Sequence, residues 1–229
     1  MRVGALIRSY HSTQYLPLVL KQYKWVDKIV VLNYRFINVK PSLDNTQRIC
    51  NLFSHPNLVY ERGRGVEQHE IFNRGLDLLQ DCNLAFIADA DEILLPSDQE
   101  EITRFMSDRR GLIGQADSAA CKIIDYNGDL FHASPQRAYP VTVAVVPQVV
   151  RFNHIRNINN NRVKVFPDIT LHHLGLVFPE ETIKWKSEWE FKEEGHSRNK
   201  LLKDWGVRRE VKPPQELLNF IGELYEQKL

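Results

Sequence analysis

The first 90 residues contain four short apolar segments, and the segments between them have helical spacing. The apolar segments are Arg2–Ile7, Asp27–Tyr34, Asn57–Glu61 and Leu84–Ala88. Their length and their bulky or β-branched residues are typical of strands. Because strands that alternate with helices form parallel sheets covered by those helices, we expect an α/β fold. Right-handed crossovers would then bring the carboxyl ends of the strands to one edge.

The predicted helices occupy the intervals. The segment Ser12–Trp25 offers Ser12 or Thr13 as its N-cap, a short helix begins near Asp44, and Val66–Cys82 forms the third helix. The inner face of the third helix is apolar. It comprises Ile71, Phe72, Gly75, Leu76, Leu78 and Leu79.

The second half does not continue this alternation. Ser118–Gly128 and Val141–Phe152 indicate strands, Arg162–Gly175 indicates one or two short strands, and Asn153–Arg162 indicates a polar loop. Pro213–Lys228 predicts a final amphipathic helix. We therefore expect a mixed continuation of the sheet.

Composition excludes some classes of protein. The 229 residues carry a formal net charge of +1, which gives no global signature for binding nucleic acid or anionic membrane. Cys50, Cys82 and Cys121 are far apart and indicate buried thiols in a reducing compartment. Because no signal peptide and no apolar run of about 18 residues is present, we expect no membrane span and a cytoplasmic location.

Three acids follow the fourth predicted strand in "NLAFIADADEILLP", namely Asp89, Asp91 and Glu92. In an extended segment Asp89 and Asp91 project to the same side and Glu92 to the other. Neighbouring carboxylates repel unless a cation or a proton joins them. Ligands of open α/β sheets bind at this edge, and Mg²⁺ or Mn²⁺ takes few protein carboxylates and completes its shell with phosphates. The pattern therefore predicts a metal–diphosphate site.

The alternative is that these acids only cap the next helix. The following segment "PSDQEEITRF" already contains Ser97 and Asp98 for that role, with Glu101 in the position of a capping box. Capping therefore explains Asp98 better than Asp89 or Asp91.

Three segments resemble the GT-A fold glycosyltransferases, specifically family 2-like members. They are "VGALIRSYHSTQYLPLVLKQYKWVDKIVVLN", "EQHEIFNRGLDLLQDCNLAFIADADEIL" and "RVKVFPDITLHHLG". The resemblance is good over about the first 100 residues and loose beyond them. It implies a single GT-A-type domain over residues 1–229, with a nucleotide-sugar binding half at 1–115 and an acceptor-side half at 116–229.

The resemblance also implies roles in binding a nucleotide. Arg8, Ser9 and Tyr10 would line the nucleoside pocket, and Asn73 and Gly75 would face the nucleotide. The family usually has an arginine before this asparagine, whereas this chain has Phe72 before it and Arg74 after it.

The implied metal ligands are Asp91, with Asp89 near both the ribose and the metal, and His173 or its neighbour His172. The two histidines point in opposite directions in a strand, so only one can face the site. We favour His173, although a histidine without a ligand role remains an alternative. Imidazole suits Mn²⁺ better than Mg²⁺.

An inverting transferase also needs a base. Asp125 is the first candidate, followed by Asp129 and Glu92, although "DYNGD" is typical of a turn. A retaining enzyme needs no such base. In the polar segment Phe178–Lys200, the candidates for contacting a diphosphate are His196 and Arg198. The lysines there are better explained as a solvated helix face.

The expected function is a metal-dependent glycosyltransferase of the hexosyltransferase type, with Mn²⁺ or Mg²⁺ as the metal and a UDP-sugar as the favoured donor. The acceptor hydroxyl could belong to a saccharide, a protein or a hydroxylated DNA base. The last option rests only on basic residues that could contact phosphates. These residues are Arg151, Arg156, Arg162 and Lys164.

Two other functions remain open. A sugar-phosphate nucleotidyltransferase shares the architecture but usually has a glycine-rich loop, and "IRSYHST" contains no glycine. A non-catalytic nucleotide- or sugar-binding domain would differ from the enzyme only in lacking activity.

Overall fold

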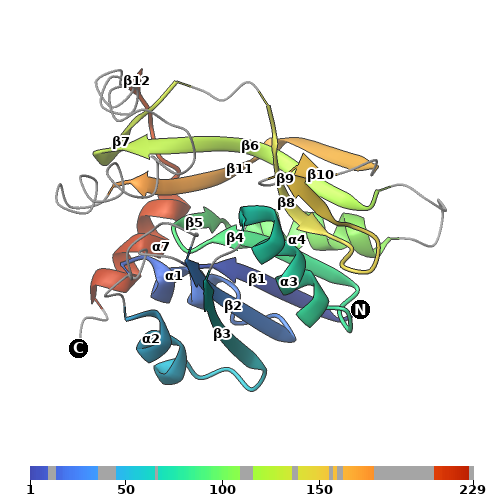
Figure 1. Cartoon of the computed structure of the whole chain (residues 1–229). Helices are drawn as coiled ribbons and strands as arrows, with labels where there is room; N and C mark the ends of the chain where they lie inside the picture. The colour runs from blue at the N-terminus through green and yellow to red at the C-terminus, as the bar shows by residue number, and fades with distance from the viewer. Residues whose placement is uncertain are drawn as a thin grey trace.

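The computed structural model describes residues 1–9, 14–35, 45–64, 67–108, 116–135, 139–154, 157–158, 162–177 and 209–226, and Figure 1 shows their arrangement. The helices are α1 (Leu16–Gln22), α2 (Thr46–Leu52), α3 (Gln68–Leu78), α4 (Pro96–Ser107) and α7 (Gln215–Glu226). The first strands are β1 (Val3–Arg8), β2 (Lys28–Arg35), β3 (Leu58–Arg64), β4 (Leu84–Asp89), β5 (Glu92–Leu94) and β6 (Ser118–Asn127). The later strands are β7 (Asp129–Ala133), β8 (Val141–Val145), β9 (Phe152–His154), β10 (Asn157–Ile158), β11 (Val163–Leu176) and β12 (Arg209–Glu210).

The first four strands form a parallel unit in the order β3-β2-β1-β4. Beyond β4 the sheet continues with β8, β6, β7 and β12, and each of these strands is antiparallel to its neighbour along that path. The expected α/β fold is therefore confirmed, with a parallel first half and a mixed second half.

The two faces of β1 pack into different parts of the core. Ala5 and Ile7 belong to a cluster with residues of α1, whereas Leu6 belongs to a cluster with residues of α3. Successive side chains of a strand point to opposite faces. Because both faces are covered, the strand is apolar throughout rather than alternating with polar residues.

Strand β11 is one strand of 14 residues, where the sequence indicated one or two short ones. It runs parallel to β6, and its later part also pairs with β5 in the antiparallel sense. The register shifts between Phe166 and Thr170, around Pro167. Proline cannot donate to a ladder, so a bulge there lets the strand continue past it.

Two segments expected to be loops contain strands. Strand β7 lies where a connection was predicted, and Gly128 makes the tight link to it from β6 with a positive φ of 84°. Asp125 is accordingly part of β6 and not of a turn. The described part of Asn153–Arg162 includes the hairpin partner β10.

Helix starts also differ from the expectation. The residues before α1 and α4 are Tyr15 and Leu95, which are not capping types. Helix α4 begins at Pro96, whose fixed φ suits a first helical position. Capping by Ser97 and Asp98 was therefore a wrong prediction, because both residues lie inside the first turn. Ser12 and Thr13 lie outside the described residues.

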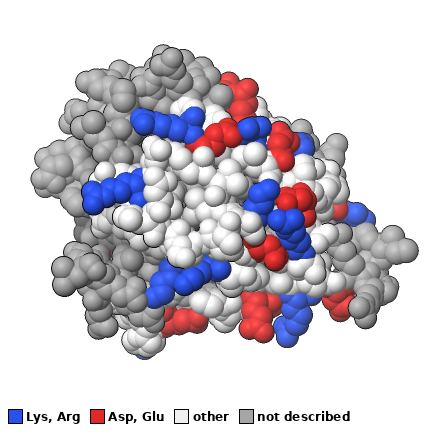
Figure 2. Space-filling model, turned by 90° about the horizontal axis from the view of Figure 1, so that it is seen from below, with Lys and Arg blue, Asp and Glu red and all other residues white. Residues whose placement is uncertain are grey.

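Other expectations concern the core and the surface. Cys50, Cys82 and Cys121 are buried, as predicted. Within the described ranges, no helix combines the length and the apolar character needed to cross a membrane. On the face seen in Figure 2, basic and acidic side chains of the described residues intermingle, which agrees with the small net charge.

Replacing Gly75 with alanine tests the contact between α3 and β1. A Cβ atom at this position would lie 2.8 Å from Cγ of the buried Leu6. Overpacking a core costs about 1–3 kcal/mol, whereas alanine gains about 1 kcal/mol over glycine in helix propensity. We expect Gly75→Ala to lower the free energy of unfolding in urea titrations.

Gly222 in α7 is the matched control, because a Cβ atom there meets nothing within 4 Å. Gly222→Ala should gain up to about 1 kcal/mol. Equal stabilisation by both substitutions would contradict the close packing of α3 on β1.

Asp98 should make stability depend on pH. Burial, followed by the negative charge of Glu216, raises the pKa of the Asp98 carboxyl to about 6. The folded state then binds a proton more tightly than the unfolded state, so stability falls as the pH rises from about 4 to about 6. We expect Asp98→Asn to stabilise the protein by about 1–2 kcal/mol at pH 7.5, but not at pH 4.

The measurement is urea unfolding at both pH values. Glu100→Gln removes an exposed acid from the same helix and should have little effect at either pH. A gain for Asp98→Asn that is the same at pH 4 and pH 7.5 would contradict this electrostatic account.

Candidate functional site

The three acids lie at the carboxyl edge of the parallel strands, but a turn separates them. Asp89 ends β4, Ala90 and Asp91 form the turn, and Glu92 begins β5. The backbone N–H of Asp89 donates to Oε2 of Glu92 at 2.7 Å, and the N–H of Ala90 donates to the carbonyl of Arg8 at 2.9 Å. The segment is not extended, so the strand alternation expected for these acids does not apply. Each acid has a different partner.

Asp89 pairs with Arg8, which is its neighbour across the parallel register of β1 and β4. The guanidinium donates Nε–H to Oδ1 at 2.7 Å and Nη2–H to Oδ2 at 2.8 Å. Both side chains are mostly buried, and the guanidinium also lies 5.5 Å from the centre of the Phe72 ring. This bidentate pair compensates the charge of Asp89 inside the protein.

Asp91 faces His173, which in turn contacts Asp125. The His173 Nδ1 lies 2.6 Å from Oδ1 of Asp125, and its Nε2 lies 3.7 Å from Oδ1 of Asp91. The exposed fractions of the Asp91, Asp125 and His173 side chains are 6%, 13% and 23%. The sequence therefore predicted residues that the fold brings together, although it did not indicate the Asp125–His173 contact.

The pKa of His173 reflects these carboxylates. Burial disfavours the charged imidazole, but the hydrogen bond to Asp125 and the charges of Asp91, Asp125 and Glu92 outweigh it and raise the pKa to about 9. The surroundings of Nε2 thus favour a positive charge. A metal ion bound at Nε2 would have to replace the proton there.

His172 points the other way, as strand alternation predicts. It is buried, its Nδ1 lies 3.0 Å from the hydroxyl of Tyr126, and the two rings stack with centroids 5.9 Å apart. Burial lowers the pKa of His172 to about 4, so this imidazole is neutral at physiological pH. His172 is a core residue, and of the two neighbouring histidines it is His173 that faces the acids.

Asp91 and His173 fit a divalent cation that takes few protein ligands. A metal-binding histidine usually donates its other ring N–H to a carboxylate, and Asp125 occupies that position. The described residues contain no group of three or more His, Cys, Asp or Glu side chains placed to hold a metal ion, but Nε2 of His173 and Oδ1 of Asp91 face each other across 3.7 Å. Mg²⁺ and Mn²⁺ sites of this kind keep positions for phosphate oxygens and water.

Other predicted site residues have partners inside the fold. Ser9 is fully buried, and its hydroxyl lies 3.2 Å from that of Thr46. The Asn73 amide donates to the carbonyl of Phe152 and accepts from its N–H, both at 2.9 Å, so it anchors β9 to α3. Gly75 allows α3 to pack on Leu6. Tyr10, His196 and Arg198 lie outside the described residues.

The other carboxylates considered as bases also have partners. Asp129 accepts from the N–H of Phe131 at 2.8 Å and lies 2.8 Å from Nδ1 of His132 at the start of β7, which is a turn arrangement. Glu92 fixes the turn after β4, as described above.

The basic residues considered for contacting DNA are largely paired. Arg151 binds Asp77, Arg162 binds Asp117, and Lys164 lies over the ring of Phe105. Arg156 lies outside the described residues. The described members therefore do not form a set of unpaired cations.

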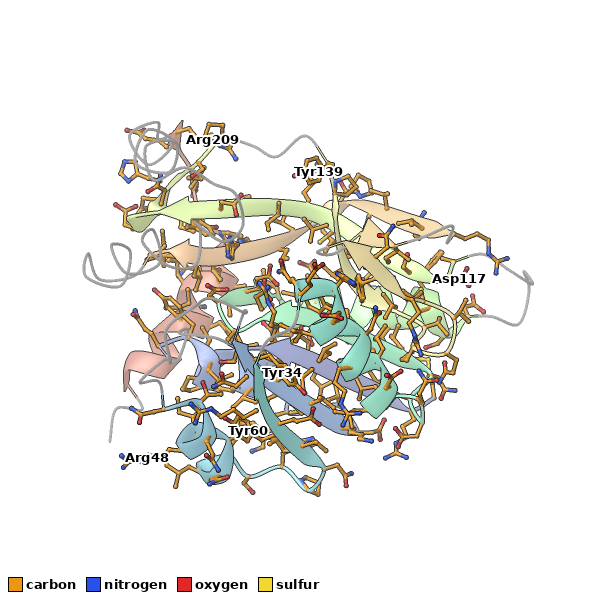
Figure 3. All side chains as sticks on the ribbon, in the orientation of Figure 1. Tyr34, Arg48, Tyr60, Asp117, Tyr139 and Arg209 are labelled. Carbon is orange, nitrogen blue, oxygen red and sulfur yellow. The ribbon has the colours of Figure 1, made fainter. Side chains whose placement is uncertain are left out.

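No sequence pattern indicated a further interaction, which joins Tyr34 of β2, Glu61 of β3 and Arg74 of α3. Glu61 accepts from Arg74 at 3.0 and 2.8 Å and also from the hydroxyl of Tyr34, whose position Figure 3 labels. The hydrogen bond from Arg74, followed by that from Tyr34, lowers the pKa of Glu61. The pairing of β2 with β3 brings Tyr34 close to Glu61, and α3 supplies Arg74.

The Arg8–Asp89 pair can be tested with a double-mutant cycle using Arg8→Ala and Asp89→Ala. Because the pair is bidentate and mostly buried, we expect a coupling energy of about 1–3 kcal/mol in urea unfolding. The pair Arg151–Asp77 is the control, since both side chains are about half exposed, and should couple by less than about 1 kcal/mol. Equal coupling in the two cycles would contradict the proposed burial of charge.

Comparison with known proteins identifies the fold. No protein-family model matches the chain, and no curated protein matches its sequence. The structure of S. aureus TarS 1–349 matches with a TM-score of 0.53 and 14% identity, covering 87% of this chain and 73% of that one. TarS 1–349 in complex with UDP gives 0.52 and 13%, with the same coverage.

A longer TarS structure gives a TM-score of 0.53 and 14% identity, and the match covers 87% of this chain but only 45% of that one. HddC from Yersinia pseudotuberculosis gives a lower TM-score of 0.47 with 8% identity, covering 81% of this chain and 98% of that one. The parallel order β3-β2-β1-β4 and the agreement with TarS over most of the chain show that this protein has a GT-A-type fold.

Proposed function

We propose that the protein is a metal-dependent glycosyltransferase that transfers a sugar from a nucleotide diphosphate sugar to a hydroxyl acceptor. The observation that carries this proposal is the placement of Asp91 opposite His173, at the carboxyl edge of a GT-A-type sheet. Ligands of open α/β sheets bind at this edge. The structure of TarS in complex with UDP supports UDP-sugars as the first donors to test.

Asp91 and His173 would hold the divalent cation. The bound cation would act as a Lewis acid that stabilises the charge of the departing diphosphate. Imidazole nitrogen favours Mn²⁺ over Mg²⁺. Asp89 is a neighbour of Asp91 in the chain, but both of its side-chain oxygens accept hydrogen bonds from Arg8. We therefore assign Asp89 a minor role in binding the cation.

The protein groups around the cation have separate tasks. The Arg8–Asp89 pair fixes the ends of β1 and β4, and Glu92 fixes the turn that presents Asp91. Fixed groups of this kind need no reorganisation when charge develops on the leaving group. From the sequence resemblance, we retain Tyr10, His196 and Arg198 as candidates for contacting the nucleotide.

The acceptor site is assigned to the second half of the chain. A saccharide or protein hydroxyl is favoured over a DNA base, because the described basic residues have intramolecular partners. Phosphate contacts usually supply much of the affinity for DNA. Strong binding of DNA that weakens as the salt concentration rises would reverse this preference.

A donor screen tests the proposed function. UDP- and GDP-sugars are titrated into the protein with Mn²⁺, Mg²⁺ or EDTA, and both binding and sugar release are measured. We expect Mn²⁺-dependent binding of at least one nucleotide sugar. Asp91→Asn should weaken that binding by more than the roughly 10- to 100-fold that loss of a carboxylate behind a metal ligand costs, because Asp91 would bind the metal itself. A screen in which no nucleotide sugar binds in a metal-dependent manner would refute the proposal.

Asp77→Asn is the matched control, because it removes one exposed carboxylate from α3 and should bind the donor like the wild type. Sugar 1-phosphates with nucleoside triphosphates are assayed in parallel. Pyrophosphate release in that assay would identify a nucleotidyltransferase instead. Binding without turnover of any donor and acceptor would support a non-catalytic domain.

A further inference from the structure

The position of His173 depends on two strand pairings. In β11, His173 is opposite Asp125 in the parallel ladder with β6 and opposite Glu92 in the antiparallel ladder with β5. Its imidazole therefore lies between the turn that carries Asp91 and the end of β6. The 2.6 Å contact joins Nδ1 to Asp125, while Nε2 faces Asp91.

This contact limits what Asp125 can do as a base. A catalytic base must come within about 2.6–3.2 Å of the acceptor hydroxyl whose proton it removes. One oxygen of Asp125 is already in contact with Nδ1 of His173, and the side chain is only 13% exposed. The imidazole is therefore within its reach, and the geometry of this contact suits orienting that ring.

We infer that Asp125 is a positioning residue that holds His173 with Nε2 facing Asp91 and the metal, and not the base that activates the acceptor. The inference rests on the proposed function for the presence of the metal. By accepting from Nδ1–H, the carboxylate fixes both the ring orientation and the tautomer that leaves Nε2 for a metal. Such a contact also strengthens the ligand.

The charge distribution agrees with this role. Arg8 compensates Asp89, whereas Asp91, Asp125 and Glu92 all act on the imidazole of His173. A cation with two positive charges suits this cluster of carboxylates. Loss of Asp125 would therefore remove a charge that favours the metal as well as the contact that orients its ligand.

The experiment measures Mn²⁺ binding directly, by electron paramagnetic resonance, with and without UDP. We expect Asp125→Ala to weaken Mn²⁺ binding about 10- to 100-fold and to reduce the nitrogen coupling from His173 in the Mn²⁺ spectrum. Asp125→Asn should have an intermediate effect, because its amide oxygen can still accept from Nδ1–H but carries no charge. If the alanine variant does not fold, the Mn²⁺ affinity and nitrogen coupling of the asparagine variant provide the test.

Asp117→Ala is the matched control, since it removes a carboxylate just before β6, at the right of Figure 3, and its side chain contacts Arg162. It should bind Mn²⁺ like the wild type. If the Asp125 variants keep wild-type Mn²⁺ affinity and nitrogen coupling but lose sugar transfer, Asp125 is a base and the inference is overturned, while the proposed function stands. Absence of Mn²⁺ binding in the wild type, with and without UDP, would overturn both.

Discussion

The pairing of β11 with both β5 and β6 is the constraint on which the candidate site depends. One residue of this strand, His173, is opposite Glu92 in one ladder and opposite Asp125 in the other. A slip of one residue would turn His172 towards the acids and move His173 into the core. The burial of His172 and its contact with Tyr126 oppose that slip, so the core fixes which histidine faces the site.

The acids at the end of β4 divide into two electrostatic groups. Asp89 is compensated by Arg8, while Asp91 lies with His173 and Asp125 in a region that favours positive charge. A short acidic motif thus contributes a structural ion pair and a candidate metal ligand from positions only two residues apart. The turn between β4 and β5 makes this division possible, because it breaks the regular alternation of an extended strand.

The local features of the sequence predicted the first half of the fold well. The apolar runs and helical spacing indicated the four parallel strands, the edge where the acids lie and the opposite directions of His172 and His173. What could not be predicted depends on long-range register. Arg8 and Asp89 are 81 residues apart, and His173 and Asp125 are 48 apart, so no local pattern reports their contacts. The resemblance to a family implied that Asn73 faces the nucleotide, but it did not indicate the two hydrogen bonds that join the Asn73 amide to the backbone of β9.

The most direct test of the central claim is calorimetric titration of UDP into wild-type protein and Asp91→Asn, each with Mn²⁺ and with EDTA. The account predicts that wild-type protein binds UDP more tightly with Mn²⁺ than with EDTA, and that Asp91→Asn loses most of this difference while remaining folded. UDP binding that is the same with Mn²⁺ and with EDTA in the wild type would contradict a metal–diphosphate site at Asp91 and His173.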